Sequence, residues 1–143
     1  MNLSNSFTLE QFTFSYEGQR KGLYNTPNDE QIANLTELAQ VLERVQKLLQ
    51  YPIHINSAFR SPKVNSAVGG SPTSAHLDGY AADFTCKEFG TPLQVCQAIV
   101  MSDIPFDQCI YEYESWCHLS IDSRMRKMVL SKHAGEPYTN GLA

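Results

Sequence analysis

The stretch Ser74-Ala75-His76-Leu77-Asp78-Gly79-Tyr80-Ala81-Ala82-Asp83 decides how this chain is interpreted. It places an imidazole, His76, and a carboxylate, Asp83, close together among small residues, which let the backbone bring side chains onto a metal ion. A second run, Trp116-Cys117-His118, supplies another imidazole. Two histidines and one aspartate make a three-ligand set. Such a set leaves one coordination position of zinc open for water, which is typical of a catalytic site.

These runs carry a family resemblance. They resemble the ligand segments of the zinc D-Ala-D-Ala peptidases (family M15), and the short phage and prophage subgroup is the most similar. Three further segments fit the same family: Ser57–Asn65 around an arginine, Gly69-Gly70 before the first ligand, and Ile110–Ser120 before and after the last. The resemblance spans roughly Phe7 to Ser131 and is carried by a combined motif far more specific than a lone H-x6-D. It implies an α+β fold shared with the Hedgehog signalling domain.

The resemblance also implies a function. The expected protein is a zinc-dependent peptidase that hydrolyses stem peptides of bacterial peptidoglycan, as a D-Ala-D-Ala carboxypeptidase or an L-Ala-D-Glu endopeptidase. A phage or prophage lysis enzyme, or a peptidase carried on a virion with other virion proteins, suits the chain. The alternative is a non-catalytic phage structural module with the same fold, and a metal-independent binding domain is a third interpretation. The intact ligand set favours the enzyme.

Candidates for the remaining catalytic roles follow from the family motifs. Arg60 is the expected cation, which would stabilise negative charge on the carbonyl oxygen or hold a substrate carboxylate. A zinc peptidase also needs a proton acceptor, normally a carboxylate. Some family members place an acid three positions before the last histidine, where this chain has Ser115. Glu112 is therefore the first candidate for the base, and Glu114 the second.

Other polar residues near the motifs receive smaller roles. Ser74 and Trp116 are candidates for hydrogen-bonding groups around the metal ligands, and Ser74 could orient one of them. Asp78 is expected to be a solvated turn carboxylate. His54 and His133 lack motif context and are expected to take no part in the metal site.

Bulk properties predict one ordinary domain. The chain has 143 residues, 42% of them hydrophobic and 18% charged, with a formal net charge of −4. Without a basic cluster, nucleic acid is not an expected partner. No apolar run is long enough to span a bilayer, and the first residues lack the pattern of a secretory signal. We therefore expect a protein that is cytoplasmic as synthesised and reaches the cell wall after release or on a virion.

The four cysteines, Cys86, Cys96, Cys109 and Cys117, form no C-x-x-C pair, which argues against a zinc ribbon or a redox motif. We expect four free, mostly buried thiols. Because alternate residues of a strand face opposite sides, Cys117 should point away from His118.

Periodicity predicts an α+β fold with a small antiparallel sheet and helices packed on one face. Helices are expected from Thr8, which opens a capping box, over Asp29–Gln50, and from Thr91 to about Ser102. The predicted strands, in chain order, cover 52–57, 80–86, 106–112, 116–121 and 124–131. Leu9, Phe12 and Tyr16 are expected to share one helix face. Residues 61–74 should be mostly loop with one helical turn. The single domain has its core at about 7–131, followed by a loose tail from Gly135 to Ala143.

Overall fold

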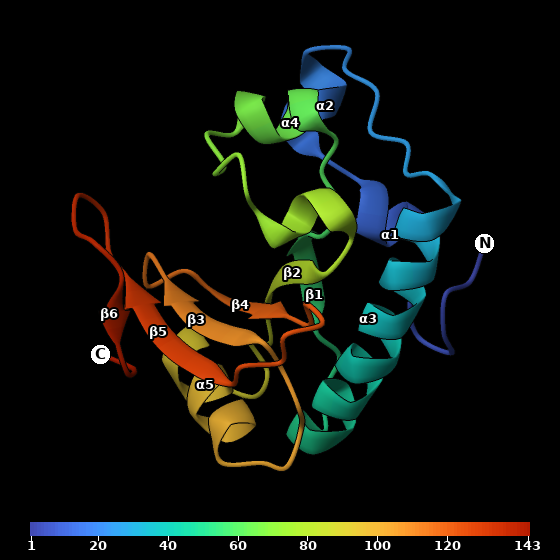
Figure 1. Cartoon of the computed structure of the whole chain (residues 1–143). Coiled ribbons are helices and arrows are strands. Elements are labelled where there is room, and N and C mark those ends of the chain that lie inside the picture. Colours follow the sequence, from blue (N-terminus) through green and yellow to red (C-terminus); the bar gives the residue numbers. More distant parts are fainter.

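A computed structural model describes all 143 residues. Its longest helix is α3, where an apolar residue recurs every three or four positions and buries one side in the core. Asn28 and Gln31 form a capping box that starts this helix. Figure 1 shows α3 running along one side of the molecule. The helices are α1 (Leu9–Thr13), α2 (Tyr16–Arg20), α3 (Asp29–Leu49), α4 (Pro62–Ala67), α5 (Pro92–Val100) and the 3-10 turn η1 (Ala75–Asp78).

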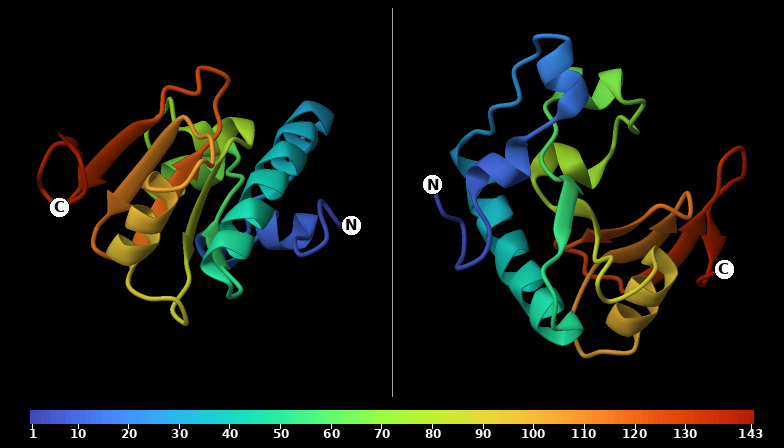
Figure 2. Two further views of the ribbon diagram at one scale, coloured as in Figure 1. Left: turned by 90° about the horizontal axis from the view of Figure 1, so that it is seen from below. Right: turned by 180° about the vertical axis from the view of Figure 1, so that it is seen from behind.

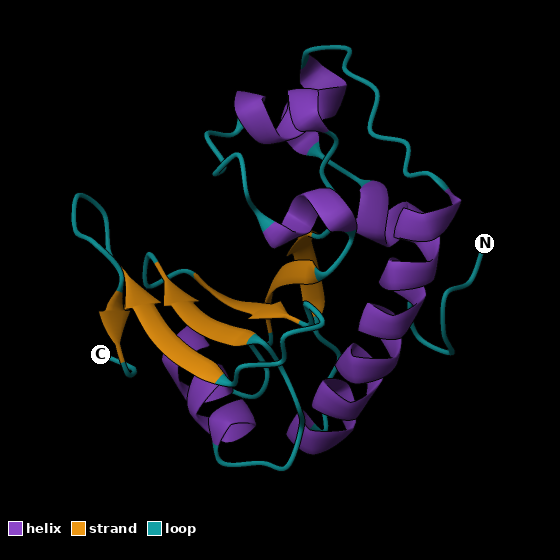
Figure 3. Cartoon of the chain, in the orientation of Figure 1, coloured by secondary structure: helices purple, strands orange, loops and turns teal.

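Six strands form one sheet in the order β1-β2-β4-β3-β5-β6. All neighbouring strands are antiparallel except β3 and β5, which are parallel. Figure 3 shows the sheet between two groups of helices. The α+β fold expected from the sequence is therefore confirmed, with a sheet that is mostly antiparallel. The strands are β1 (His54–Ser57), β2 (Ala81–Thr85), β3 (Gln108–Glu112), β4 (Trp116–Ser120), β5 (Met128–Lys132) and β6 (Thr139–Asn140).

The two faces of the sheet differ in what covers them. One face packs on α5, with α3 beside it, and buries an apolar cluster that includes Phe84, Cys109 and Leu119. On the other face, η1 and α4 stand over the β1–β2 end and leave the β3–β5 end open (Figures 1 and 2). Because side chains alternate along a strand, the polar residues Asp83 and His118 lie on this open face.

Three local features differ from the expectations. The first helix ends at Thr13, and Tyr16 instead begins α2 and is exposed, so it does not extend the apolar face of Leu9 and Phe12. Strand β5 pairs in parallel with β3, whereas an antiparallel sheet was expected. The C-terminal residues, expected as a loose tail, include β6, and the Ser131 hydroxyl bonds to the Gly141 carbonyl over 2.7 Å.

The longest helix of the fold is α3, with 21 residues. No helix is both long and apolar enough to cross a membrane. The N- and C-termini lie at opposite ends of the molecule (Figure 2).

Candidate metal centre and active-site cleft

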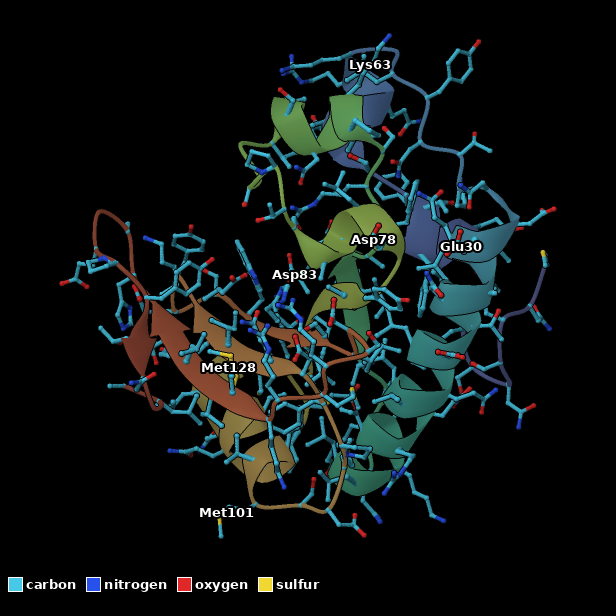
Figure 4. All side chains as sticks on the ribbon, viewed as in Figure 1. Glu30, Lys63, Asp78, Asp83, Met101 and Met128 are labelled. Carbon is cyan, nitrogen blue, oxygen red and sulfur yellow. The ribbon has the colours of Figure 1, made fainter.

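The three expected metal ligands converge. Asp83 of β2 and His118 of β4 are directly opposed in the sheet, and His118 Nδ1 lies 2.9 Å from Asp83 Oδ1. His76 reaches the same oxygen from η1, with its Nε2 at 3.3 Å. The ligand atoms of all three residues lie within 4.8 Å of one another, and all three residues are buried. In Figure 4, Asp83 lies between the sheet and the short helices above it.

This geometry fits zinc. Donors about 2.0–2.1 Å from a tetrahedral zinc ion lie about 3.3 Å apart, close to the spacings around Asp83 Oδ1. His76 Nδ1 is 2.6 Å from the carbonyl oxygen of Ala58, which assigns the ring proton to Nδ1 and leaves Nε2 free to bind a metal. The rings of His76 and His118 meet edge to face, with centroids 5.1 Å apart. Imidazole nitrogens with one carboxylate oxygen are a donor set that suits zinc.

The turn that carries His76 is fixed at both ends. Ser74 caps η1, since its hydroxyl accepts a hydrogen bond from the backbone N–H of His76 over 3.2 Å. At the other end Gly79 has φ of +81°, and a Cβ there would lie 2.8 Å from the Gln31 carbonyl oxygen. Glycine is therefore required both by the left-handed backbone and by the close approach of α3. Ser74 thus contacts the backbone of His76, and its role in orienting a metal ligand stays a prediction.

Helix α3 also holds this turn through two amides that the sequence analysis did not single out. Gln31 Nε2 donates to the Leu77 carbonyl over 3.1 Å, and Asn34 Nδ2 donates to the Asp78 carbonyl over 2.8 Å. The Asp78 side chain itself is exposed, as expected. The polar edge of α3 thus positions the His76 turn while its apolar face packs in the core.

Arg60 lies beside the metal ligands and contacts one of them. Its Nη2 lies 3.2 Å from Asp83 Oδ2, its Nε 3.1 Å from Ser57 Oγ and its Nη1 3.3 Å from Asn65 Oδ1. The backbone N–H of Arg60 also donates to the His76 carbonyl over 3.1 Å. Every side-chain nitrogen therefore has a partner, and the guanidinium orients Asp83 so that Oδ1 faces the histidines. The role of Arg60 towards substrate stays a prediction.

Electrostatic coupling within the cluster is strong. Burial alone would raise the pKa of Asp83, but the adjacent His76 and His118 hold that pKa well below its usual range. Burial likewise opposes protonation of His118, yet the hydrogen bond that the ring can donate to Asp83 raises the pKa of this histidine. Asp83 is thus ionised, as a metal ligand must be.

Of the two candidate bases, Glu112 reaches the cluster. Glu112 Oε1 lies 3.9 Å from His118 Nδ1 and accepts a hydrogen bond of 2.8 Å from the indole of Trp116. Its Oε2 has no hydrogen-bond partner in the chain. Glu114 lies in the turn after β3, and its exposed carboxylate pairs with His133 instead. Neither His133 nor His54 joins the metal ligands.

A cleft of about 720 Å³ surrounds these residues. Its walls include the expected Arg60, Ser74, Glu112 and Trp116 together with the three ligands. Glu114 is not among them. The cleft is also lined by residues that the sequence analysis did not select, namely Asp107, Gln108, Asp122, Arg124, Arg126 and Tyr138.

A family model described as Peptidase M15 matches residues 5–120 of the chain. The chain belongs to the peptidase M15 family. This confirms the resemblance of the motifs and identifies a peptidase of the zinc D-Ala-D-Ala carboxypeptidase type at the level of the family. M15 peptidases are generally zinc-dependent, and His76, Asp83 and His118 provide a possible site. No curated protein matches the chain.

The region that matches the M15 family model ends at residue 120, where β4 ends, whereas several residues that line the cleft come later in the chain. Asp122, Arg124, Arg126, Leu130 and Tyr138 all line it, and all follow residue 120. Part of the wall is thus built by the segment that carries β5 and β6, outside the region that matches the family.

A second group of metal-ligating side chains lies on the opposite face of the M15 sheet. Cys96, Cys109 and Cys117 lie close together, with Cys109 Sγ and Cys117 Sγ 3.9 Å apart. All three are fully buried members of the apolar core, and all four cysteines of the chain are free, as expected. Because burying thiolates without a nearby cation is costly, these thiols pack as small apolar side chains. Cys117 faces away from His118, also as expected.

Proposed function

We propose that this M15 family member is a zinc-dependent peptidase that hydrolyses stem peptides of bacterial peptidoglycan. The observation that carries the proposal is the meeting of His76, Asp83 and His118 in a cleft beside Glu112, a carboxylate with one free oxygen. Candidate bonds are D-Ala-D-Ala, cut by a carboxypeptidase, and L-Ala-D-Glu, cut by an endopeptidase. The resemblance to phage and prophage enzymes supports a role in lysis or on a virion.

In this proposal the residues of the site have separate roles in hydrolysis. Zinc held by the three ligands would lower the pKa of water and polarise the peptide carbonyl. Glu112 takes the proton of the attacking water and delivers it to the nitrogen of the leaving amine, since Glu112 lines the cleft and one of its carboxylate oxygens has no hydrogen-bond partner in the chain. The indole of Trp116 restrains the carboxylate through Oε1. Arg60 holds Asp83 in its orientation through the contact with Oδ2.

The test uses purified peptidoglycan and defined stem peptides. The zinc-loaded protein should release new amino groups, and a chelator should stop the release until zinc is restored. Glu112→Gln with bound zinc serves as the inactive control. If the wild-type protein holds zinc and releases nothing, the proposal fails, and the non-catalytic structural module of a phage becomes the better interpretation.

A further inference from the structure

Three of the four cysteines form a cluster that takes no part in the proposed hydrolysis. Each comes from a different element: Cys96 from α5, Cys109 from β3 and Cys117 from β4. Their sulfur atoms lie within 4.8 Å of one another, and all three side chains are fully buried. Figure 1 shows α5 beneath the sheet, away from α4. The packing of α5 on β3 and β4 therefore gathers three metal-binding sulfurs at one point.

The spacing of these sulfurs fits a single metal ion. Three sulfurs in a plane, each about 2.3 Å from a central ion, lie about 4.0 Å from one another. Cys109 Sγ and Cys117 Sγ are 3.9 Å apart, so these two sulfurs need little movement to share an ion. Without an ion, the same spacing is a contact between two thiols. Because the two residues lie on neighbouring paired strands, this pair is preformed, and Cys96 closes the triangle from α5.

The donor atoms select a soft ion with a low coordination number. Sulfur ligands suit Cu(I) and zinc, whereas hard ions such as magnesium and calcium prefer oxygen. Structural zinc is almost always bound by four protein ligands. This cluster has three ligands, and the side chains packed with it belong to the apolar core. Three sulfurs without a fourth donor therefore favour Cu(I) over zinc.

Charge also favours a monovalent ion. An ion in an apolar core must be neutralised by its ligands, because an unpaired buried charge is costly. The hydrogen bonds that the thiols of Cys109 and Cys117 can donate lower the pKa of the Cys96 thiol below its ordinary value. A single thiolate at Cys96 balances the charge of one Cu(I), whereas a divalent ion would require a second buried thiolate. The proton of the Cys96 thiol passes to solvent when the ion binds.

We propose that Cys96, Cys109 and Cys117 form a second metal site, which binds one Cu(I) ion on the face of the sheet opposite the cleft. The two sites share β4, because the consecutive residues Cys117 and His118 face opposite sides of this strand. One site offers nitrogen and oxygen donors and the other only sulfur, so the chain would separate two metals by donor chemistry. The bound ion would connect α5 to the sheet. This inference does not depend on the proposed peptidase activity.

The test measures Cu(I) binding by the whole, zinc-loaded chain in the absence of oxygen. Cu(I) is supplied as its bicinchoninate complex, both to the folded chain and during refolding, because the three sulfurs are fully buried. We expect one Cu(I) per chain, and X-ray absorption at the copper edge should show three sulfur neighbours at about 2.3 Å. No copper retained by the chain, or nitrogen neighbours in the spectrum, would overturn the inference. Zinc content and hydrolysis, measured on the same samples, report separately on the proposed function.

Matched cysteine variants locate the copper. Cys96→Ala should weaken Cu(I) binding by at least about 10–100-fold, since even the hydrogen-bonding partners of metal ligands contribute that much. Cys86→Ala is the control, because Cys86 is equally buried but its thiol donates to the carbonyls of Tyr51 and Pro52. Its Cu(I) affinity should equal that of wild type.

Equal Cu(I) affinity in Cys96→Ala and wild type would contradict the proposed site. Loss of copper from His76→Ala instead would place the ion in the cleft. Circular dichroism verifies that each variant folds. The absorption spectrum of the wild-type protein decides the question without any variant, since it distinguishes sulfur from nitrogen neighbours directly.

Discussion

Glu112 and Trp116 are directly opposed across strands β3 and β4, and the indole Nε1 of Trp116 donates a 2.8 Å hydrogen bond to Glu112 Oε1. The bond restrains the carboxylate of Glu112 near His118, which follows Trp116 by two residues on β4. It also occupies one oxygen and leaves the other without a hydrogen-bond partner in the chain. A carboxylate restrained in this way is prepared for proton transfer at a fixed position.

This arrangement predicts different outcomes for the two glutamates. Glu112→Gln keeps the shape and the acceptor for Trp116, so zinc content should be retained while hydrolysis falls by about 10²–10⁴-fold. Glu114→Gln should stay within a few-fold of wild type, because Glu114 points to His133 outside the cleft. Initial rates with a stem peptide, measured at equal zinc content, check both. An exchange of the two outcomes would identify Glu114 as the base.

The metal ligands can be tested without any activity assay. His76→Ala and His118→Ala should each lose the zinc that wild type binds at one ion per chain, because two remaining donors hold zinc poorly. His54→Ala is the matched control, since His54 is exposed on β1 and is not part of the ligand set. Elemental analysis gives the stoichiometry, and circular dichroism verifies folding. Full zinc content in either ligand variant would contradict the assignment.

The contacts of Arg60 predict an effect on metal affinity. Arg60→Ala leaves Asp83 Oδ2 without its cation, so zinc affinity should fall by about 10–100-fold, the usual effect of removing a partner of a metal ligand. Arg60→Lys should recover part of the loss because it restores the charge without the planar fork. Competition with a chromogenic chelator measures the affinities. Unchanged affinity together with a rate loss of about 2–4 kcal/mol would instead support direct stabilisation of the oxyanion.

Local signals in the sequence were sufficient for the ligands and most of the elements. Capping boxes at Thr8, Asn28 and Thr91 mark three helix starts, and each is present in the structure. The ligand motif places His76 on a turn and Asp83 on the strand that follows, so their convergence could be expected from a short stretch of chain. These features depend on residues close together in the sequence, where periodicity and capping chemistry are informative.

Long-range features could not be predicted in the same way. The parallel pairing of β5 with β3 depends on how the chain returns across the sheet, which no local pattern records. The contact of Arg60 with Asp83 joins residues 23 positions apart, and the bond from Gln31 to the Leu77 carbonyl joins residues 46 positions apart. Tyr138 reaches the cleft only because β6 pairs with β5. Nothing in the composition near Gln31 or Tyr138 distinguishes these two residues from ordinary surface groups.

The ion pair between Asp107 and Arg126 predicts how stability depends on pH. Hydrogen bonds from Arg126 lower the pKa of Asp107 below its ordinary value, against the opposing effect of burial. A carboxyl group whose pKa is lower in the folded than in the unfolded protein stabilises the fold above the unfolded pKa, about 3.9. That contribution is lost as pH falls through the folded value.

Asp107→Asn should therefore lower the free energy of unfolding at pH 7 by about 1–3 kcal/mol, the cost of weakening a buried, charge-assisted set of hydrogen bonds. The difference from wild type should shrink below about pH 4, because the wild-type carboxyl group then becomes protonated as well. Asp103→Asn is the control: its side chain is 94% exposed and pairs with Arg44 at the surface, so the change should have little effect at any pH. Urea titrations at several pH values, with metal removed from every sample, give the comparison. A difference that stays constant from pH 7 to pH 3 would mean that packing, not the charge of Asp107, accounts for the loss.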